Sequence, residues 1–202
     1  MSKQRYAVQH LRRIFEGFVN LDQYELTVTR GTERLTAVRE VHDHGNGAAV
    51  LPVDPERRTA LLVRQVRTPV HIAGHDGRIL EAAAGVIDPE DDGPEAAAIR
   101  EGREELGYHV HNLTHVSTFF PIPGAVTEQM SCFHATYGPG DKIAGAREAD
   151  DDELIDVEEW PLDALWAAYK SGTLTDGKAI VCLLGLRLDR PELFDDQAGT
   201  KS

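Results

Sequence analysis

Hydrophobic and polar positions alternate along much of the chain in short stretches, a pattern that predicts strands joined by tight turns. Two strands are expected at 18–28 and 34–41, with the turn Thr29–Thr32 between them. Further apolar or alternating stretches of strand length predict extended segments at 48–53, 59–66, 79–86, 114–122, 131–137 and 154–160.

Three segments have the marks of helices. Pro94 suits a first helical turn, Ala96–Ala98 are strong helix formers, and Gly107 is placed as a stop, so a central helix is expected from about residue 94. Two more helices are expected at 161–170 and 177–188. Because strands and helices do not alternate regularly, the pattern predicts an α+β sandwich and not a doubly wound sheet.

Composition narrows the class of protein. The chain has 202 residues, of which 41% are hydrophobic and 27% charged, as expected for one globular protein with a real core. Lys and Arg number 21 against 34 Asp and Glu, giving a net charge of −13. Such an acidic chain is disfavoured as a nucleic-acid binder, because affinity for the phosphate backbone comes largely from Lys and Arg. A phosphate-bearing ligand would need metal ions or a few placed cations.

The cysteines and the apolar stretches indicate where in the cell the protein is expected. Cys132 and Cys182 lie in apolar runs and are expected as buried thiols in a reducing compartment, with a disulfide as the alternative. The longest strongly apolar stretch, 179–186, is far too short to span a bilayer. We therefore expect a cytoplasmic protein without membrane contact.

The central helix carries an unusual group of acids. Glu101, Glu104 and Glu105 are spaced i, i+3 and i+4, on one helix face. Like charges at these spacings destabilise a helix by roughly 0.2–0.5 kcal/mol per pair, so something should compensate. One interpretation is a solvated face relieved by Arg100 and Arg103; the other is a carboxylate site for hard divalent cations.

The segment from Ala84 to Tyr108 resembles the Nudix box, the motif of hydrolases that act on nucleoside diphosphates linked to another moiety. The matching residues are Gly85, Arg100, Glu101, Glu104, Glu105, Gly107 and Tyr108. Three departures stand out: six residues instead of five separate Gly85 from the acid of the box, that acid is Asp92 where Glu is usual, and Gly102 occupies an apolar position. The extra residue is expected in the loop before the helix.

Other segments resemble the ADP-ribose and GDP-mannose pyrophosphatase branch of this family, namely 39–47, 63–67, 81–85, 123–128 and 172–178. The last of these, with 45–47, looks closest to the GDP-mannose type. The resemblance implies Mg²⁺-dependent hydrolysis of the diphosphate bond of a nucleoside diphosphate sugar, with GDP-mannose as first choice and ADP-ribose as the alternative. A nucleotide-binding sensor without hydrolysis is the alternative of another class.

The resemblance also implies an architecture, an α/β/α sandwich with a mixed sheet. We expect N-terminal strands at 1–42 forming a β-hairpin dimerisation module, a Nudix hydrolase domain at 43–190 and a polar tail at 191–202. The expected partner is a second copy, in a homodimer whose N-terminal strands pack on or swap with each other. An edge hairpin of a monomer is the alternative.

Roles carry over residue by residue from the resemblance. The metal, Mg²⁺ with Mn²⁺ as the alternative, would be held by the backbone carbonyl of Ala84 and by Glu101, Glu105 and Glu153. The expected catalytic residues are Arg100, Glu104 and Glu153, although Asp150–Asp152 compete with Glu153 in the same acidic run. The expected substrate contacts are Arg39, Glu40, Arg67, Gly85, Val86, Glu105, Glu128, Asp152 and Lys178.

Overall fold

The computed structural model describes residues 4–145 and 155–194. The chain divides into two compact units, one made of Met1–Asn46 with Phe120–Gln129, the other of Gly47–Phe119 with Met130–Ser202. We call them unit 1 and unit 2 and describe them one at a time.

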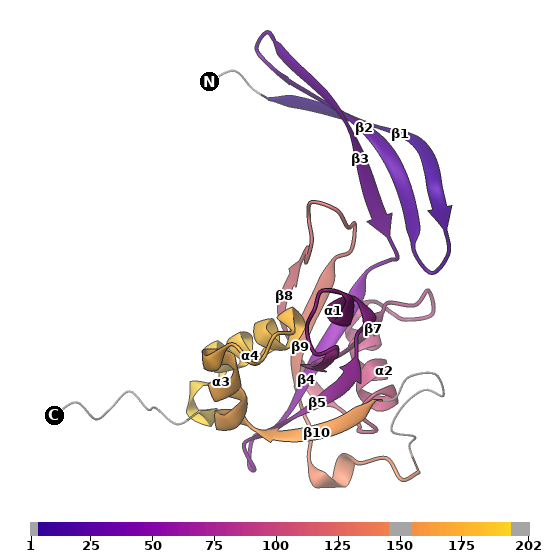
Figure 1. Ribbon diagram of the computed structural model, residues 1–202. Coiled ribbons are helices and arrows are strands. Elements are labelled where there is room, and N and C mark those ends of the chain that lie inside the picture. The colour runs from indigo at the N-terminus through magenta and orange to yellow at the C-terminus, as the bar shows by residue number, and fades with distance from the viewer. Residues whose placement is uncertain (1–3, 146–154, 195–202) are drawn as a thin grey trace, which may run out of the picture. The chain divides into compact units, whose positions relative to one another are not determined.

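Unit 1 contains a three-stranded antiparallel sheet in the order β1-β2-β3 (Figure 1). Its strands are β1 (Arg5–Glu16), β2 (Asn20–Arg30) and β3 (Glu33–Asp43). The second and third strands and the turn between them confirm the expected hairpin, and Gly31 takes the positive φ of 63° that this turn requires. The first strand was missed, because both of its faces are exposed and its register is broken by two bulges.

One face of this sheet is apolar. Paired residues of neighbouring strands point to the same side, and the register aligns Tyr6 with Val28 and Leu35, and Val8 with Leu26. Tyr6 is 77% exposed, and Val8 and Leu35 are each 60% exposed. The single chain therefore leaves a contiguous hydrophobic surface open to water, which monomers usually avoid.

Unit 2 is built on a seven-stranded mixed sheet (Figure 1). The main path runs β10-β5-β4-β9-β8, with β6 paired to β5 and β7 paired to β4. The sheet is mixed because β4 and β9 pair in parallel, whereas the other strand pairs of this path are antiparallel. The predicted stretch 79–86 is two short strands that part at Ala82. The strands are β4 (Gly47–Asp54), β5 (Thr59–Val66), β6 (Arg78–Glu81), β7 (Ala83–Val86), β8 (His111–Phe119), β9 (Met130–Thr136) and β10 (Asp156–Pro161).

Helices cover both faces of this sheet. On one face α3 (Leu162–Ser171) and α4 (Gly177–Asp189) pack against Leu51 and Leu62. On the other face α2 (Pro94–Glu104) packs through Ala97 and Ala98 against residues such as Val50 and Leu61. A short helix, α1 (Thr68–Ile72), and the 3-10 turns Pro139–Asp141 and Pro191–Leu193 complete the elements. The α+β class and the sandwich with a mixed sheet are confirmed.

Two glycines allow the helices to approach the sheet and its connections closely. A Cβ at Gly185 of α4 would lie 2.3 Å from Val116 Cγ1 on β8. A Cβ at Gly102 of α2 would lie 3.1 Å from both γ-carbons of Val110. The second contact explains why Gly102 occupies a position where the Nudix pattern has a larger apolar residue: Val110 already fills that space.

The two cysteines meet in the core between β9 and α4. Cys132 and Cys182 are both buried free thiols. A hydrogen bond between them, together with burial, raises the pKa of Cys182. In residues 4–145 and 155–194, no helix is long and apolar enough to cross a membrane.

Candidate active site

The site forms where the last turns of α2 face β7. Gly93, with φ of 86°, leads into Pro94 at the first helical position, and the helix continues through its alanines to Glu104. Gly107 then takes a left-handed φ of 69° and ends the turn. This geometry directs Glu101 and Glu105, one turn apart, toward the strand.

Glu101 packs directly on the backbone of Gly85. A Cβ built at residue 85 would lie 1.9 Å from Glu101 Oε1, so no residue other than glycine fits without displacing the carboxylate. Glu101 is 7% exposed. Burial raises the pKa of Glu101, although a 2.6 Å hydrogen bond from Arg100 Nη1 partly opposes this.

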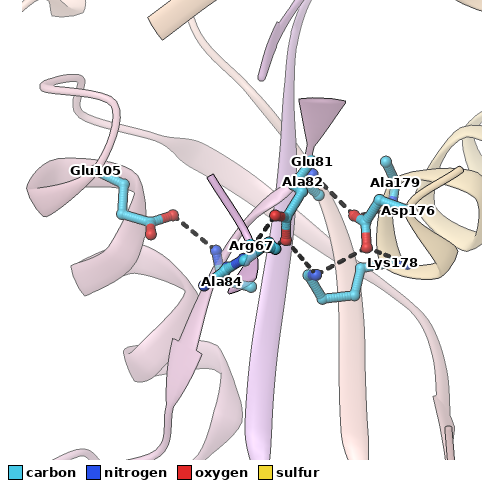
Figure 2. A network of polar contacts seen from close by, with 8 residues as sticks. All are labelled: Arg67, Glu81, Ala82, Ala84, Glu105, Asp176, Lys178 and Ala179. Atoms are coloured by element: carbon cyan, nitrogen blue, oxygen red, sulfur yellow. Dashed lines mark hydrogen bonds and ion pairs between the residues drawn. The ribbon is translucent and has the colours of Figure 1, made fainter. Parts of the chain in front are cut away.

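Glu105 is held on the neighbouring residue of the same strand. The backbone N–H of Ala84 donates to Glu105 Oε2 at 2.9 Å (Figure 2). Glu101 of α2 and Glu105, the residue directly after this helix, thus contact adjacent residues of β7, beside the Ala84 carbonyl that was predicted as a ligand. Carboxylate and carbonyl oxygens are the ligands of hard divalent cations, so these residues fit such an ion.

Glu104 differs from its two neighbours. Its side chain is 59% exposed, and its Oε2 accepts a 2.9 Å hydrogen bond from Arg100 Nη1. In the described parts of the chain, no three His, Cys, Asp or Glu side chains converge into a metal-holding group. The three acids expected on one helix face are therefore divided: Glu101 and Glu105 contact β7, whereas Glu104 is exposed to solvent.

Arg100 connects the acidic face of the helix to the loop before it. Its guanidinium donates to Glu101, to Glu104, to the Val86 carbonyl at 2.9 Å, and to both oxygens of Asp91 at 3.2 and 3.0 Å. These acceptors, Asp91 first, raise the pKa of Arg100 further. One cation thereby offsets the repulsion among the acids and fixes the loop onto the helix.

The partner of Arg100 corrects one detail of the expected motif. We aligned Asp92 with the acid of the Nudix box, but Asp91 forms the paired hydrogen bonds to Arg100. Five residues separate Gly85 from Asp91, which is the spacing of the Nudix box. The extra residue lies between Asp91 and α2. Counting five residues from Gly85 would have found this acid.

A second polar cluster, which we call the Glu81 cluster, lies near β7 (Figure 2). Arg67 donates to Glu81 through Nε at 2.7 Å and Nη2 at 3.1 Å. Lys178 Nζ donates to Glu81 at 2.9 Å and to Asp176 at 2.8 Å. Asp176 also caps α4 and accepts the Ala82 N–H. Glu81 thus brings the predicted contacts Arg67 and Lys178 together, and Asp176 holds Lys178. Neither acid was assigned a role from the sequence.

The remaining predicted residues fall into three groups. Gly85 and Val86 lie on β7 beside Glu101 and Arg100. Arg39 and Glu40 on β3, and Glu128 in the segment 120–129, belong to unit 1. Glu153 and Asp152 lie outside the described residues.

Comparisons with known proteins identify the family. The model of the NUDIX domain matches residues 43–180. A GDP-mannose pyrophosphatase of Yersinia pestis (strain Pestoides F) is 37% identical over 161 residues, 79% of each chain. Proteins of the same name from Klebsiella pneumoniae and Enterobacter sp. (strain 638) are 38% and 36% identical, covering 79% and 82% of this chain and 79% and 85% of their own. The chain therefore belongs to the Nudix family.

Proposed function

We propose that this Nudix enzyme hydrolyses the diphosphate bond of a nucleoside diphosphate sugar, with GDP-mannose as the first choice, to a nucleoside monophosphate and a sugar phosphate. The observation that carries the proposal is the placement of Glu101 and Glu105 on adjacent residues of β7. The names of the similar proteins support the choice of GDP-mannose.

Nudix hydrolases generally use divalent metal ions. Here we propose Mg²⁺, with Mn²⁺ as the alternative, held by Glu101, Glu105, the Ala84 carbonyl and Glu153. When bound, such an ion neutralises diphosphate oxygens and lowers the pKa of a bound water.

The side chains around the metal ligands have separate tasks. Arg100 holds Glu101 and Glu104 through charge-assisted hydrogen bonds, which keeps Glu101 over Gly85. The proton of the attacking water passes to a carboxylate, for which Glu104 and Glu153 are the candidates. Because catalysis of phosphoryl transfer rests on positioning and electrostatics, these fixed orientations matter more than added reactivity.

Substrate contacts complete the proposal. A chain with a net charge of −13 must place cations where the diphosphate binds, and Arg67 and Lys178 are the cations we assign to the diphosphate or terminal sugar. Further contacts are assigned to Gly85, Val86 and Glu105 in unit 2, and to Arg39, Glu40, Glu128 and Asp152.

We also propose a homodimer formed through the apolar face of the unit 1 sheet, with the N-terminal strands packed on or exchanged with those of the partner. The support is the exposure of Tyr6, Val8 and Leu35 on one face. Residues 1–42 would then act as the dimerisation module of a hydrolase domain at 43–190. We expect the protein in the cytoplasm, where the buried thiols Cys132 and Cys182 stay reduced.

A panel of nucleotide sugars assayed with Mg²⁺ tests the substrate. We expect the highest kcat/KM with GDP-mannose among substrates that include ADP-ribose. A far higher kcat/KM with ADP-ribose would replace the first choice by the alternative. Tight binding of a nucleotide sugar without turnover of any member of the panel would indicate the sensor instead.

A further inference from the structure

Glu81 is a buried carboxylate that has no assigned role in the proposed reaction. It is 2% exposed and is the last residue of β6, where pairing with Val63 of β5 fixes its backbone. Its two oxygens accept three charge-assisted hydrogen bonds, two from Arg67 and one from Lys178 (Figure 2). A buried charge is tolerated only when it is paired this well, so the arrangement calls for an explanation beyond packing.

Glu81 keeps two cations next to each other. Arg67 Nη2 lies 3.1 Å and Lys178 Nζ 2.9 Å from the same oxygen, Glu81 Oε2. Two like charges repel at such separations, and the shared carboxylate offsets that repulsion. The cations come from distant parts of the chain, Arg67 from the residue before α1 and Lys178 from the first turn of α4.

The Glu81 cluster is neutral in sum but turns its positive groups outward. The side chains of Glu81 and Asp176 are 3% and 7% exposed, whereas those of Arg67 and Lys178 are 35% and 20% exposed. An ammonium group has three N–H donors, and the contacts within the described residues give Lys178 Nζ two acceptors, Glu81 and Asp176. One donor remains for an external acceptor.

We propose that Glu81 is a positioning residue that holds Arg67 and Lys178 as a preformed pair of donors for the anionic oxygens of the diphosphate. This inference rests on the proposed function, because it concerns the same substrate. Preformed donors bind an anion without first losing side-chain freedom, which is how an otherwise acidic protein gains local affinity for phosphate.

The test replaces Glu81 by glutamine, which keeps the shape and removes the charge. In E81Q, kcat/KM for GDP-mannose should fall by about tenfold or more, chiefly through KM, as expected when a buried charge pair is broken. The Mg²⁺ concentration for half-maximal activity should change less than about twofold, since Glu81 is not among the assigned metal ligands. The simple electrostatic expectation is opposite: removing a negative charge near a phosphate site should tighten binding. A lower KM in E81Q would therefore overturn the proposal.

The matched control is Glu158→Gln. Glu158 is also a strand glutamate that accepts a pair of hydrogen bonds from an arginine, Arg64, and it takes no part in the proposed site. E158Q should keep the KM of the parent enzyme. An equal rise of KM in both variants would mean that the loss of any such ion pair raises KM, and would refute the positioning role of Glu81.

A double-mutant cycle with Lys178→Met tests whether Glu81 acts through Lys178. E81Q should cause much less loss in the K178M background than alone, because its main partner is already gone. Fully additive losses would contradict the mechanism. If E81Q does not fold, Glu81→Asp takes its place: the shorter side chain keeps the charge but cannot reach both cations, and an unchanged KM in folded E81D would overturn the proposal.

Calorimetry with inorganic pyrophosphate in excess Mg²⁺ separates this inference from the proposed function. Weaker binding in E81Q supports the role of Glu81 even if no nucleotide sugar is hydrolysed, in which case only the proposed substrate falls. If GDP-mannose is hydrolysed and E81Q retains the KM and pyrophosphate affinity of the parent, the proposed function stands and the role of Glu81 falls.

Discussion

Residue 85 illustrates how one missing side chain can make room for a buried carboxylate. The Glu101 carboxylate occupies the space that a Cβ at this position would need. Gly85→Ala should displace Glu101 and reduce kcat by about a hundredfold, since shifts near 1 Å in a catalytic group have effects of this size. Steady-state kinetics checks this, with Gly140→Ala as control, because a Cβ there meets nothing within 4 Å. Similar activities of the two variants would contradict the steric argument.

Neutral replacements of the box glutamates should separate chemistry from stability. Glu101→Gln and Glu105→Gln should each lower kcat by two or more orders of magnitude, on the order of the loss of a preorganised electrostatic group. The melting temperature should change little, because burial already disfavours the charged form of Glu101. Kinetics and thermal melts of the same preparations give both readings. Full activity in both variants would refute the metal assignment.

The pH dependence of stability should report the pairing of Glu81. Burial opposes its ionisation, but the hydrogen bonds from Arg67 and the charge of Lys178 prevail and hold the pKa of Glu81 below its usual value of 4.5. Because the folded state has the lower pKa, this stabilisation is present above about pH 4.5 and is lost as the pH falls through the folded value. Urea unfolding at several pH values should therefore show a smaller acid-induced loss for E81Q than for the parent protein.

At the scale of elements, the contact of α4 with β8 depends on Gly185. A Cβ there would lie 2.3 Å from Val116 Cγ1, so Gly185→Ala should reduce the free energy of unfolding by about 1–3 kcal/mol through overpacking. Adding Val116→Ala should recover part of the loss. Gly177→Ala, in the first turn of the same helix with no atom within 4 Å of the added Cβ, is the control for helix propensity. Denaturant unfolding measures all four proteins.

Helices and strands with a clear periodicity of hydrophobic positions could be predicted from the sequence, and those without one could not. The strand at 59–66 and the helix beginning at Pro94 were found at their true positions, because each has a long apolar pattern or a strong start signal. The strand Arg5–Glu16 was missed because it has no buried face, and α1 because five residues show no period. The break at Ala82 follows from tertiary contacts, including its N–H bond to Asp176.

The same distinction applies to the site. Glu101, Glu105 and Arg100 could be found because one helix sets their spacing. Glu81 and Lys178 are 97 residues apart, and no local sequence pattern predicts that their side chains form an ion pair. Asp91 was within reach of the motif but was overlooked in favour of its neighbour Asp92.

At the scale of the whole molecule, the open face of the unit 1 sheet should control association. Leu35→Asp places a charge on the apolar surface formed with Val28 and Tyr6, and we expect it to convert a dimer into a monomer of 22.3 kDa. Thr36→Asp, on the opposite side of the same strand, is the control. Sedimentation equilibrium gives the masses; a monomeric parent protein, or a dimeric L35D, would contradict the proposed interface.

The position of this sheet ahead of unit 2 in the sequence has a consequence for biosynthesis. The ribosome synthesises β1, β2 and β3 before any strand of unit 2. The apolar face of their sheet is therefore exposed to water while translation continues. β1, one of the two edge strands of this sheet, carries Arg5, Arg12 and Arg13, and charges on an edge strand oppose pairing with other nascent chains. We expect neutralisation of Arg5 to increase inclusion-body formation while leaving the finished enzyme intact. Arg13 is not suited to this test, because it forms an ion pair with the buried Asp22.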